Sequence, residues 1–507
     1  MASRRTPTEM GRPFFHPDHR RPRTRREFLA QGFLAGSAYV VAPSLLSMLG
    51  VNRANAQASC ALTGAGAGKI PFIGIDLAGG ANIAGSNVMI GGPGGQEDPL
   101  SEGGYAKLGL PLDMTPLNSQ LATAFDRTMN LVFHFDSAML KGILSKASPA
   151  TLAKVEGIII SARSANDTQN NPLNPIYGVY RAGADGGLLS LIGTQNSDSG
   201  GNSVMPMSMF DPSVRPTKID RPADVRGLVD TGKLTELLGS AGAGNVASTI
   251  QAISSLKVEQ IQEDQAVKDL VNCAYQQSTD LITLFGDPAA LDPELDPLIV
   301  NANQANDTTR IFTQAEMTQS EFRKTASVMK LVLEGHAGAG TIEFGGYDYH
   351  DGTRRTGEAK DFAAGQAIGA IFEYAERNPL VGDVMVYLFS DGSVFSDGQA
   401  DNQANGKFVW RGDNSGSGVS VMMVYRKSGK PTLRAPFATT RQIGYYRANG
   451  DVETGVNSVA NNPEALTQAA ILNYMALHGE EGQFTTLFPG SAIQSDMANL
   501  LAFTQIR

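Results

Sequence analysis

Short, almost continuously apolar runs recur along the chain, and Gly, Asp, Asn or Ser residues follow most of them. Such runs lack the alternation of a strand with one wet face, so they are typical of strands that are buried on both faces of a parallel sheet. The pattern predicts strands at 69–76, 129–134, 155–161, 341–344, 383–389 and 419–425.

The stretch between the fourth and fifth of these runs has helical spacing instead. Within 357–377, apolar residues that include Ala364 and Ile368 fall on one helical face, and Asn378 and Pro379 end the pattern. Strands that alternate with helices predict an α/β fold, in which helices cover both faces of a mostly parallel sheet.

A longer stretch, at about 222–334, has helical spacing through most of its length. Its clearest helical segments are 225–238, 246–285 and 321–334. We therefore expect a mostly helical insertion within one α/β domain that comprises residues 59–507.

The first 58 residues have the features of an export signal. Residues 24–29 read TRREFL, a twin-arginine motif, and a largely apolar stretch, 30–49, follows. Small residues at 54–58 offer cleavage sites, whereas Gly, Ser and Pro make the apolar stretch a weak membrane anchor. We expect 1–58 to be a signal peptide for the twin-arginine export machinery. The mature protein is then periplasmic or secreted and has no transmembrane segment.

The charge and the cysteine content exclude several classes of protein. The net charge is −9, and the part after the leader is more acidic still, because the leader holds nine arginines and three acidic residues. This argues against nucleic acid or an anionic membrane as a partner. Only Cys60 and Cys273 occur, so no disulfide framework is expected. Gln57 stands where a lipoprotein signal preceding Cys60 needs an aliphatic residue.

Polar segments lie next to five of the predicted strands. Ligands of parallel α/β sheets bind beyond the carboxyl ends of the strands, so segments placed there are candidates for a site. The glycine-rich stretch 79–105 lacks the Lys-Ser/Thr ending of a phosphate-binding loop and is expected to be a flexible rim loop. The polar segments are 76–87, 162–171, 345–352, 390–398 and 410–418.

Four of these segments resemble a known family. The segments GGAN, RSANDTQ, EFGGYDYHDG and RGDNSG, together with the twin-arginine leader, occur in the order and rough spacing of domain-of-unknown-function family fifteen-oh-one. This bacterial exported family has a fold related to alkaline phosphatases and sulfatases, so the resemblance implies an alkaline-phosphatase-like domain. EFGGYDYHDG is similar to the family's Gly-Gly-Trp-Asp-Thr-His block, which puts Asp348 and His350 in the places of a metal-ligand pair.

Three positions depart from the family's pattern. The family's motif Arg-Ser-His-Phe-Asp has a histidine where this chain has Ala165. Its motif Asp-His-Gly corresponds to residues 413–415 here, where Asp413 is kept and Asn414 replaces the histidine. Asn82 stands where the family's loop has an aspartate. The resemblance therefore implies a metal site with fewer ligands than the family has.

Histidines are also few outside the leader, where only four occur. A phosphatase-type zinc pair draws several imidazoles to one place. His134 lies in an apolar run and is expected in the core, whereas His336 and His478 are expected at helix C-termini, where the dipole favours them. His350 is thus the one convincing imidazole ligand.

The donors predicted at the sheet edge are mostly oxygens, which suit calcium, magnesium or manganese better than zinc. Many carboxylates in one cleft would repel each other unless a cation neutralised them. We expect one divalent cation, with Asp76, Asp348, His350 and Asp413 as its ligands.

Two functions from different classes remain open. One is a non-catalytic binding or envelope-assembly role for a protein with a reduced metal site, whose partner is a small anionic ester or an envelope component. The other is a metal-dependent hydrolase of phosphate or sulfate esters. In that hydrolase Ser164 is the nucleophile and Arg163 holds the anion. Ser164 also fits an ordinary turn or helix cap.

Overall fold

The computed structural model of the protein describes residues 67–120, 124–164, 171–228, 233–260, 265–285, 290–401 and 406–507. The predicted signal peptide, 1–58, lies outside the described residues, as do Ala165, Asn166 and Asp167. In the part that is described, no helix combines the length and the apolar character that a membrane span requires.

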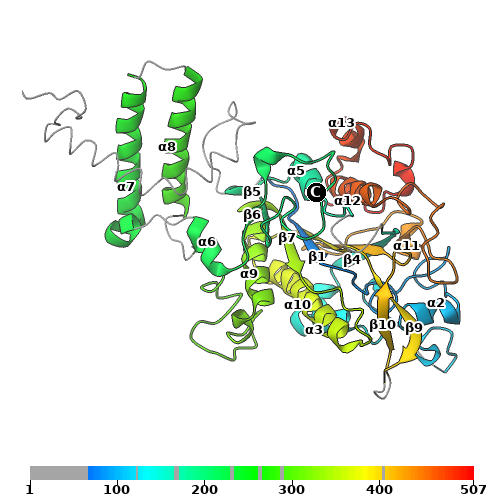
Figure 1. Ribbon diagram of the computed structural model, residues 1–507. Coiled ribbons are helices and arrows are strands. Elements are labelled where there is room, and N and C mark those ends of the chain that lie inside the picture. Colours follow the sequence, from blue (N-terminus) through cyan, green and yellow to red (C-terminus); the bar gives the residue numbers. More distant parts are fainter. Residues whose placement is uncertain are drawn as a thin grey trace, which may run out of the picture.

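An eight-stranded sheet forms the centre of the described structure, with the strand order β12-β4-β11-β8-β1-β7-β5-β6. Strand β1 (Phe72–Leu77) lies between β7 (Ala337–Phe344) and β8 (Val384–Ser390), and both pairs are parallel (Figure 1). The other strands of the sheet are β4 (Val155–Ser161), β5 (Leu189–Gly193), β6 (Thr217–Lys218), β11 (Val419–Tyr425) and β12 (Gln442–Ile443).

Strand β11 is the exception to the parallel arrangement, because it runs antiparallel to both β4 and β8. The predicted mostly parallel sheet is confirmed, but the prediction of a parallel strand at 419–425 is wrong. A strand in the middle of a covered sheet is apolar on both faces whether it is parallel or antiparallel to its neighbours. The apolar pattern of its sequence therefore does not indicate its direction.

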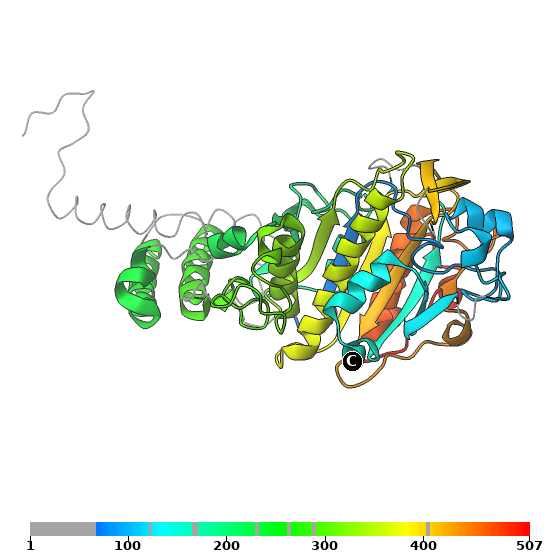
Figure 2. The same ribbon diagram turned by 90° about the horizontal axis from the view of Figure 1, so that it is seen from below.

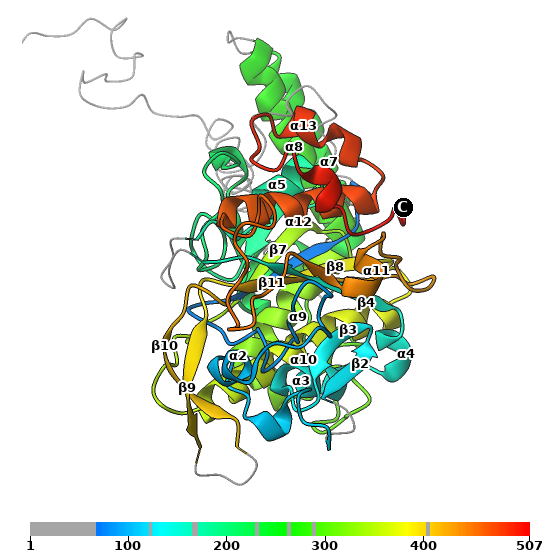
Figure 3. The ribbon, with the colours of Figure 1, turned by 90° about the vertical axis from the view of Figure 1, so that its right-hand side faces the viewer.

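Helices cover both faces of the sheet, as the alternation of elements predicts (Figure 3). Successive side chains of a strand point to opposite faces, so Ile73 and Ile75 join one apolar cluster and Phe72 joins another. The helices are α3 (Ala138–Lys146), α9 (Ser320–Leu333) and α10 (Arg355–Arg377) on the first face, seen in Figure 2, and α5 (Ile176–Arg181) and α12 (Pro463–Leu477) on the second.

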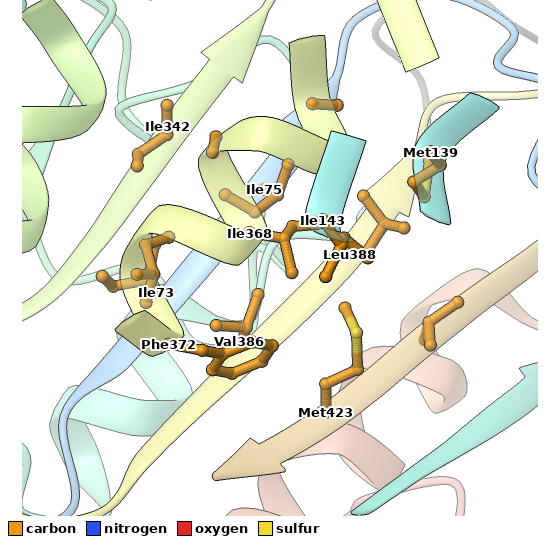
Figure 4. Packing of buried hydrophobic residues seen from close by; sticks show 14 of the residues in the cluster. Ile73, Ile75, Met139, Ile143, Ile342, Ile368, Phe372, Val386, Leu388 and Met423 are labelled. Carbon is orange, nitrogen blue, oxygen red and sulfur yellow. The ribbon is translucent and has the colours of Figure 1, made fainter. Parts of the chain in front are cut away.

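The helix predicted at 357–377 is α10, and its apolar stripe packs on the centre of the sheet. Ile368 and Phe372 lie over Ile73, Ile75 and Val386 in a fully buried cluster (Figure 4). Each of these side chains contributes roughly 1.5–3 kcal/mol through its burial. The sheet and this helix therefore form a stable base for the loops at the strand ends.

Helices α3 and α10 cross at very close range. A Cβ atom built at Gly365 would meet the carbonyl oxygen of Met139, and one built at Gly369 would lie 2.5 Å from the carbonyl oxygen of Ile143. Gly142 of α3 faces the backbone of α10 in the same way. Only residues without a side chain fit at this crossing.

The strand predicted at 129–134 exists but lies outside the main sheet. Strand β3 (Leu131–His134) pairs with β2 (Phe125–Met129) in a two-stranded hairpin. Asn130 forms the turn with a φ of 63°, a left-handed conformation that asparagine tolerates.

The predicted insertion at 222–334 is partly a separate helical unit. Helices α7 (Lys233–Val258) and α8 (Gln265–Phe285) form a hairpin that projects from the body, next to the short α6 (Pro222–Leu228) (Figure 1). Helix α9, by contrast, packs against the sheet and belongs to its helical layer. Although no disulfide framework is expected from the sequence, Cys273 of α8 is disulfide-bonded.

Shorter elements complete the described structure. A second hairpin, β9 (Val394–Ala400) with β10 (Phe408–Asp413), follows β8 and precedes β11. The remaining elements are α2 (Glu102–Lys107), η1 (Leu112–Met114), α4 (Pro149–Leu152), η2 (Pro212–Val214), η4 (Glu316–Thr318), α11 (Phe437–Thr440), η5 (Glu481–Gln483), α13 (Phe484–Leu487) and η6 (Met497–Asn499).

Candidate metal site at the carboxyl edge of the sheet

The polar segments next to the strands meet at one edge of the sheet. Strands β1, β4, β7 and β8 end there, and β11 begins there because it is antiparallel: its first residue, Val419, lies opposite Ser161, the last residue of β4. The reversed direction of β11 thus brings the segment 410–418, which precedes it, to the edge where the other four segments begin.

Three of the four predicted metal ligands come together at this edge. The Nε2 atom of His350 lies 2.6 Å from Oδ1 of Asp348 and 3.4 Å from Oδ1 of Asp413. One potential ligand atom from each residue lies within 4.8 Å of the others, and all three residues are exposed. Two carboxylates and one imidazole are therefore available to a cation from solvent.

The local sequence explains why Asp348 and His350 point the same way. Burial alternates after the end of β7: Tyr347 and Tyr349 are buried, whereas Asp348 and His350 are exposed. With this period of two, both ligands project from one side of the segment while two aromatic rings anchor the other side. The tyrosine rings lie 5.8 Å apart between centroids.

Residues in and next to the GGAN loop, 79–82, hydrogen-bond to this segment. The amide of Tyr347 donates to the carbonyl of Ala78 at 2.9 Å, and the amide of Asn82 donates to the hydroxyl oxygen of Tyr349 at 2.8 Å. Gly79 has a φ of 111°, and a Cβ there would lie 2.5 Å from the amide nitrogen of Asp348. The expected flexible rim loop is thus wrong for 79–82, where glycine permits close backbone contact.

Asp413 is the last residue of β10, and the hairpin fixes its position. It lies opposite Val394 of β9, and the amide of Asn414 donates to the carbonyl of Ser393 at 2.8 Å. Trp410 of the same strand is 1% exposed and anchors the hairpin in the core. Asp413 therefore reaches the site from a supported strand end.

Asp76, the fourth predicted ligand, lies apart from this cluster. Its carboxylate is fully buried and accepts hydrogen bonds from the amides of Asn202 and Ser203 at 2.7 and 2.8 Å, and from the Ser203 hydroxyl at 3.0 Å. Burial raises the pKa of Asp76 to about 7, although these hydrogen bonds oppose the shift. The structure does not bring Asp76 together with the other three residues.

The asparagines at the departing positions are bound by the protein itself. The side-chain amide of Asn82 donates to Asp361 at 3.3 Å, and that of Asn414 donates to the hydroxyl of Ser417 at 2.5 Å. Asn82 is also 3% exposed. The amide groups of these two side chains are therefore engaged in internal hydrogen bonds.

The predicted nucleophile lies on a neighbouring loop. The amide of Ser164 donates to the carbonyl of Ser415 at 3.1 Å, two residues beyond Asp413. Ser164 is 7% exposed, and its hydroxyl has no hydrogen-bond partner among the described residues. The side chain of Arg163 is exposed, and its amide donates to Ala460 at 2.8 Å.

Three further histidines lie away from the site. His134 is buried, with Nε2 2.9 Å from the carbonyl of Met114, and burial lowers its pKa to about 3, so the predicted core position is confirmed. His478 is the C-cap of α12, as predicted, and burial lowers its pKa to about 4. His336 follows the end of α9 and lies 3.3 Å from Glu334. Of these four histidines, only His350 joins the cluster.

The sequence analysis misses Asp361, which lies beneath the site. This carboxylate is fully buried and accepts from the side-chain amide of Asn87 at 2.7 Å, and from Asn82 as described above. The signal is present in the sequence: Asp361 lies three and seven residues before Ala364 and Ile368, on the apolar face of α10. A charged residue at core spacing in a helix indicates a buried polar network.

No family model matches the chain, and neither a curated protein nor a solved structure matches it. The resemblance to family fifteen-oh-one therefore stays a prediction.

Proposed function

We propose that the protein binds one divalent cation at Asp348, His350 and Asp413. The observation that carries this proposal is the convergence of three ligand atoms within 4.8 Å from two segments that are far apart in the sequence. All three side chains are exposed, so water or an anionic ligand can complete the coordination of the cation. The two carboxylates favour calcium, magnesium or manganese over zinc.

The role that this site supports best is binding without catalysis. The family's other ligand positions carry Asn82 and Asn414 here, and both side chains make internal hydrogen bonds, which leaves one small site rather than a metal pair. We propose an exported protein with an alkaline-phosphatase-like domain, in which the cation binds an anionic group of a small ester or of an envelope component. Periplasmic or secreted location follows from the twin-arginine motif in the leader.

Adding calcium, magnesium or manganese to chelator-treated protein should raise its melting temperature. A cation at a hundred times its Kd stabilises the folded state by about 2.7 kcal/mol, if it does not bind the unfolded chain. Asp348→Asn should remove most of this gain. Asp397→Asn is the matched control, because Asp397 is an exposed aspartate of the β9–β10 hairpin that lies 3.1 Å from Arg411.

Differential scanning calorimetry with each metal in turn provides the measurement. The proposal fails if the wild-type melting curve is the same with chelator and with every metal. It also fails if Asp397→Asn reduces the metal-induced rise in melting temperature as much as Asp348→Asn does. A response to zinc alone would keep the site but reject the hard-cation assignment.

Ester hydrolysis remains a second candidate because of one observation. The Ser164 hydroxyl is buried without a hydrogen-bond partner in the described part, on a loop bound to the segment that carries Asp413. Oγ of Ser164 would lose its proton to water and bond to the phosphorus or sulfur atom as the bond to the ester oxygen breaks and the alcohol leaves, while Arg163 would hold an oxygen of the ester. Water would then cleave the serine ester and release phosphate or sulfate. A bound cation would supply stabilisation of negative charge.

Under the hydrolase hypothesis, aryl phosphate or aryl sulfate esters should be turned over, and Ser164→Ala should abolish the turnover. The melting temperature should stay nearly unchanged, because among the described residues the hydroxyl has no hydrogen-bond partner that the substitution would remove. Ser86→Ala, at a buried serine of the glycine-rich loop, is the control that should remain active. Absence of turnover with either ester class and each metal would leave the binding role alone.

A further inference from the structure

A polar cavity lies away from the cation site, toward the other end of strand β4. Its volume is about 130 Å³, and its lining is polar apart from Val132. It lies near the amino end of β4, because the side chain of Asn130 in its wall donates to the carbonyl of Val155 at 3.0 Å. Since a water molecule occupies roughly 30 Å³ of liquid, the cavity has room for a few waters or for one small anion.

Two arginines from separate segments line this cavity. Arg127 lies on β2, whereas Arg441 follows α11, and the hydroxyl-bearing Thr439 and Thr440 precede Arg441. Glu97 is the one acidic residue of the lining. Donors therefore outnumber acceptors, and the lining residues carry one net positive charge.

The Arg127–Glu97 pair leaves part of the guanidinium group available. Nε and Nη2 of Arg127 each donate to Glu97 at 2.7 Å, and this contact lowers the pKa of the carboxyl group. No residue of the described part accepts a hydrogen bond from Nη1. A guanidinium that is held in place by a carboxylate on one side can bind an oxyanion on the other with little loss of side-chain entropy.

Arg441 adopts a backbone conformation that its residue type disfavours. It caps α11 with a φ of 51°, where glycine is usual, and the left-handed conformation costs roughly 1–2 kcal/mol for other residues. Its Nε donates to the carbonyl of Asn130, and Nη2 lies 3.6 Å from Glu156. Of the described non-glycine residues, only Asn130 and Arg441 have positive φ, and both line this cavity.

We propose that this cavity binds a small oxyanion of the phosphate or carboxylate type, at a site separate from the cation site. The strained Arg441 backbone and the oriented Arg127 place two guanidinium groups around one space of suitable size. Guanidinium groups bind such anions by paired, charge-assisted hydrogen bonds, and the Thr439 hydroxyl adds a neutral donor. The hydroxyl of Thr440 donates to the carbonyl of Gln442 at 3.4 Å. The ligand contacts neither Asp348 nor His350, so the site functions without the cation.

Isothermal titration calorimetry in the presence of chelator tests the proposal with inorganic phosphate and with acetate as probes. Arg441→Gly relieves the backbone strain and so keeps the fold, but it removes one guanidinium group. Because a hydrogen bond to a charged group contributes about 1.5–3 kcal/mol, phosphate or acetate binding should weaken about tenfold or more. Arg127→Met should weaken it to a similar extent.

Two controls should bind as the wild type does. Arg215→Ala removes an exposed arginine that pairs with Asp198 at 2.8 Å elsewhere on the surface, and Asp348→Asn alters the cation site. Phosphate binding without acetate binding would assign the phosphate class, and the reverse would assign carboxylates. The proposal is overturned if neither probe binds the wild type, or if Arg441→Gly and Arg127→Met both bind the probes as tightly as the wild type does.

Discussion

Replacing Gly365 by alanine should lower the free energy of unfolding by about 2–4 kcal/mol, a large loss for one methyl group. The added Cβ would meet the carbonyl oxygen of Met139 on α3. Neither group can rotate away, because both belong to helix backbones, so the two helices must separate and lose their shared core contacts. Denaturant unfolding followed by circular dichroism measures the loss.

Gly227→Ala provides the matched control for this substitution. Gly227 also lies in a helix, α6, but a Cβ there would have no neighbour within 4 Å. Alanine has the higher helix propensity, so this variant should be more stable by about 0.5–1 kcal/mol. If both variants unfolded at the same denaturant concentration, the close crossing of α3 and α10 would not be a major constraint on the fold.

Stability should also fall as the pH rises from about 4 to about 8, and Asp361→Asn should remove a large part of this fall. Burial raises the pKa of Asp361 from 3.8 to about 8, although hydrogen bonding by Asn87 and the charge of Lys407 oppose the shift. The folded state thus holds a proton that the unfolded chain releases above pH 4. The contribution of protonated Asp361 to the free energy of unfolding is fully present below pH 4 and is lost as the pH rises through 8.

The size of this effect follows from the shift. One pKa unit corresponds to about 1.4 kcal/mol, so a shift of this size amounts to a few kcal/mol by pH 8. Asparagine has nearly the same shape and does not ionise. The free energy of unfolding of Asp361→Asn, relative to wild type, should therefore increase steadily between pH 5 and pH 8, as measured by urea unfolding.

Asp307→Asn serves as the control for the pH series. Hydrogen bonds from Asn301 and Thr309 hold the pKa of Asp307 below its usual range, which is the opposite direction. The effect of Asp307→Asn on the free energy of unfolding should therefore change with pH only below about pH 4, and it should stay constant from pH 5 to pH 8. Parallel curves for wild type and Asp361→Asn over that range would contradict the assignment of a buried neutral carboxyl group.

Much of the fold follows from the apolar pattern of the sequence. The runs at 69–76, 155–161, 341–344 and 383–389 lie in the sheet, and the stripe at 357–377 is the helix that covers it. Burial on both faces leaves a strong local signal, because most positions of such a strand are apolar. Short edge strands such as β6 and β12 comprise too few buried residues to produce a recognisable apolar run in the sequence.

The sequence predicts part of the candidate site, because it shows in which direction the side chains of Asp348 and His350 point. Asp348 and His350 are two residues apart, so the alternation of burial puts both on one side, and this can be seen in the sequence. Asp76 was predicted beside them because it lies at the end of a strand. However, its carboxylate bonds to residues 202 and 203, which no local pattern links to it.

The sequence by itself determined the α/β class, the covered mostly parallel sheet and the polar segments from which a site could be built, because these depend on the spacing of residue types along the chain. The tertiary structure decided that β11 runs antiparallel, and therefore that Asp413 meets His350. It also decided that Asp76 is internal and that Asp361 lies buried beneath the site. Strand direction and long-range contacts depend on how distant segments pack, and that information is not local in the sequence.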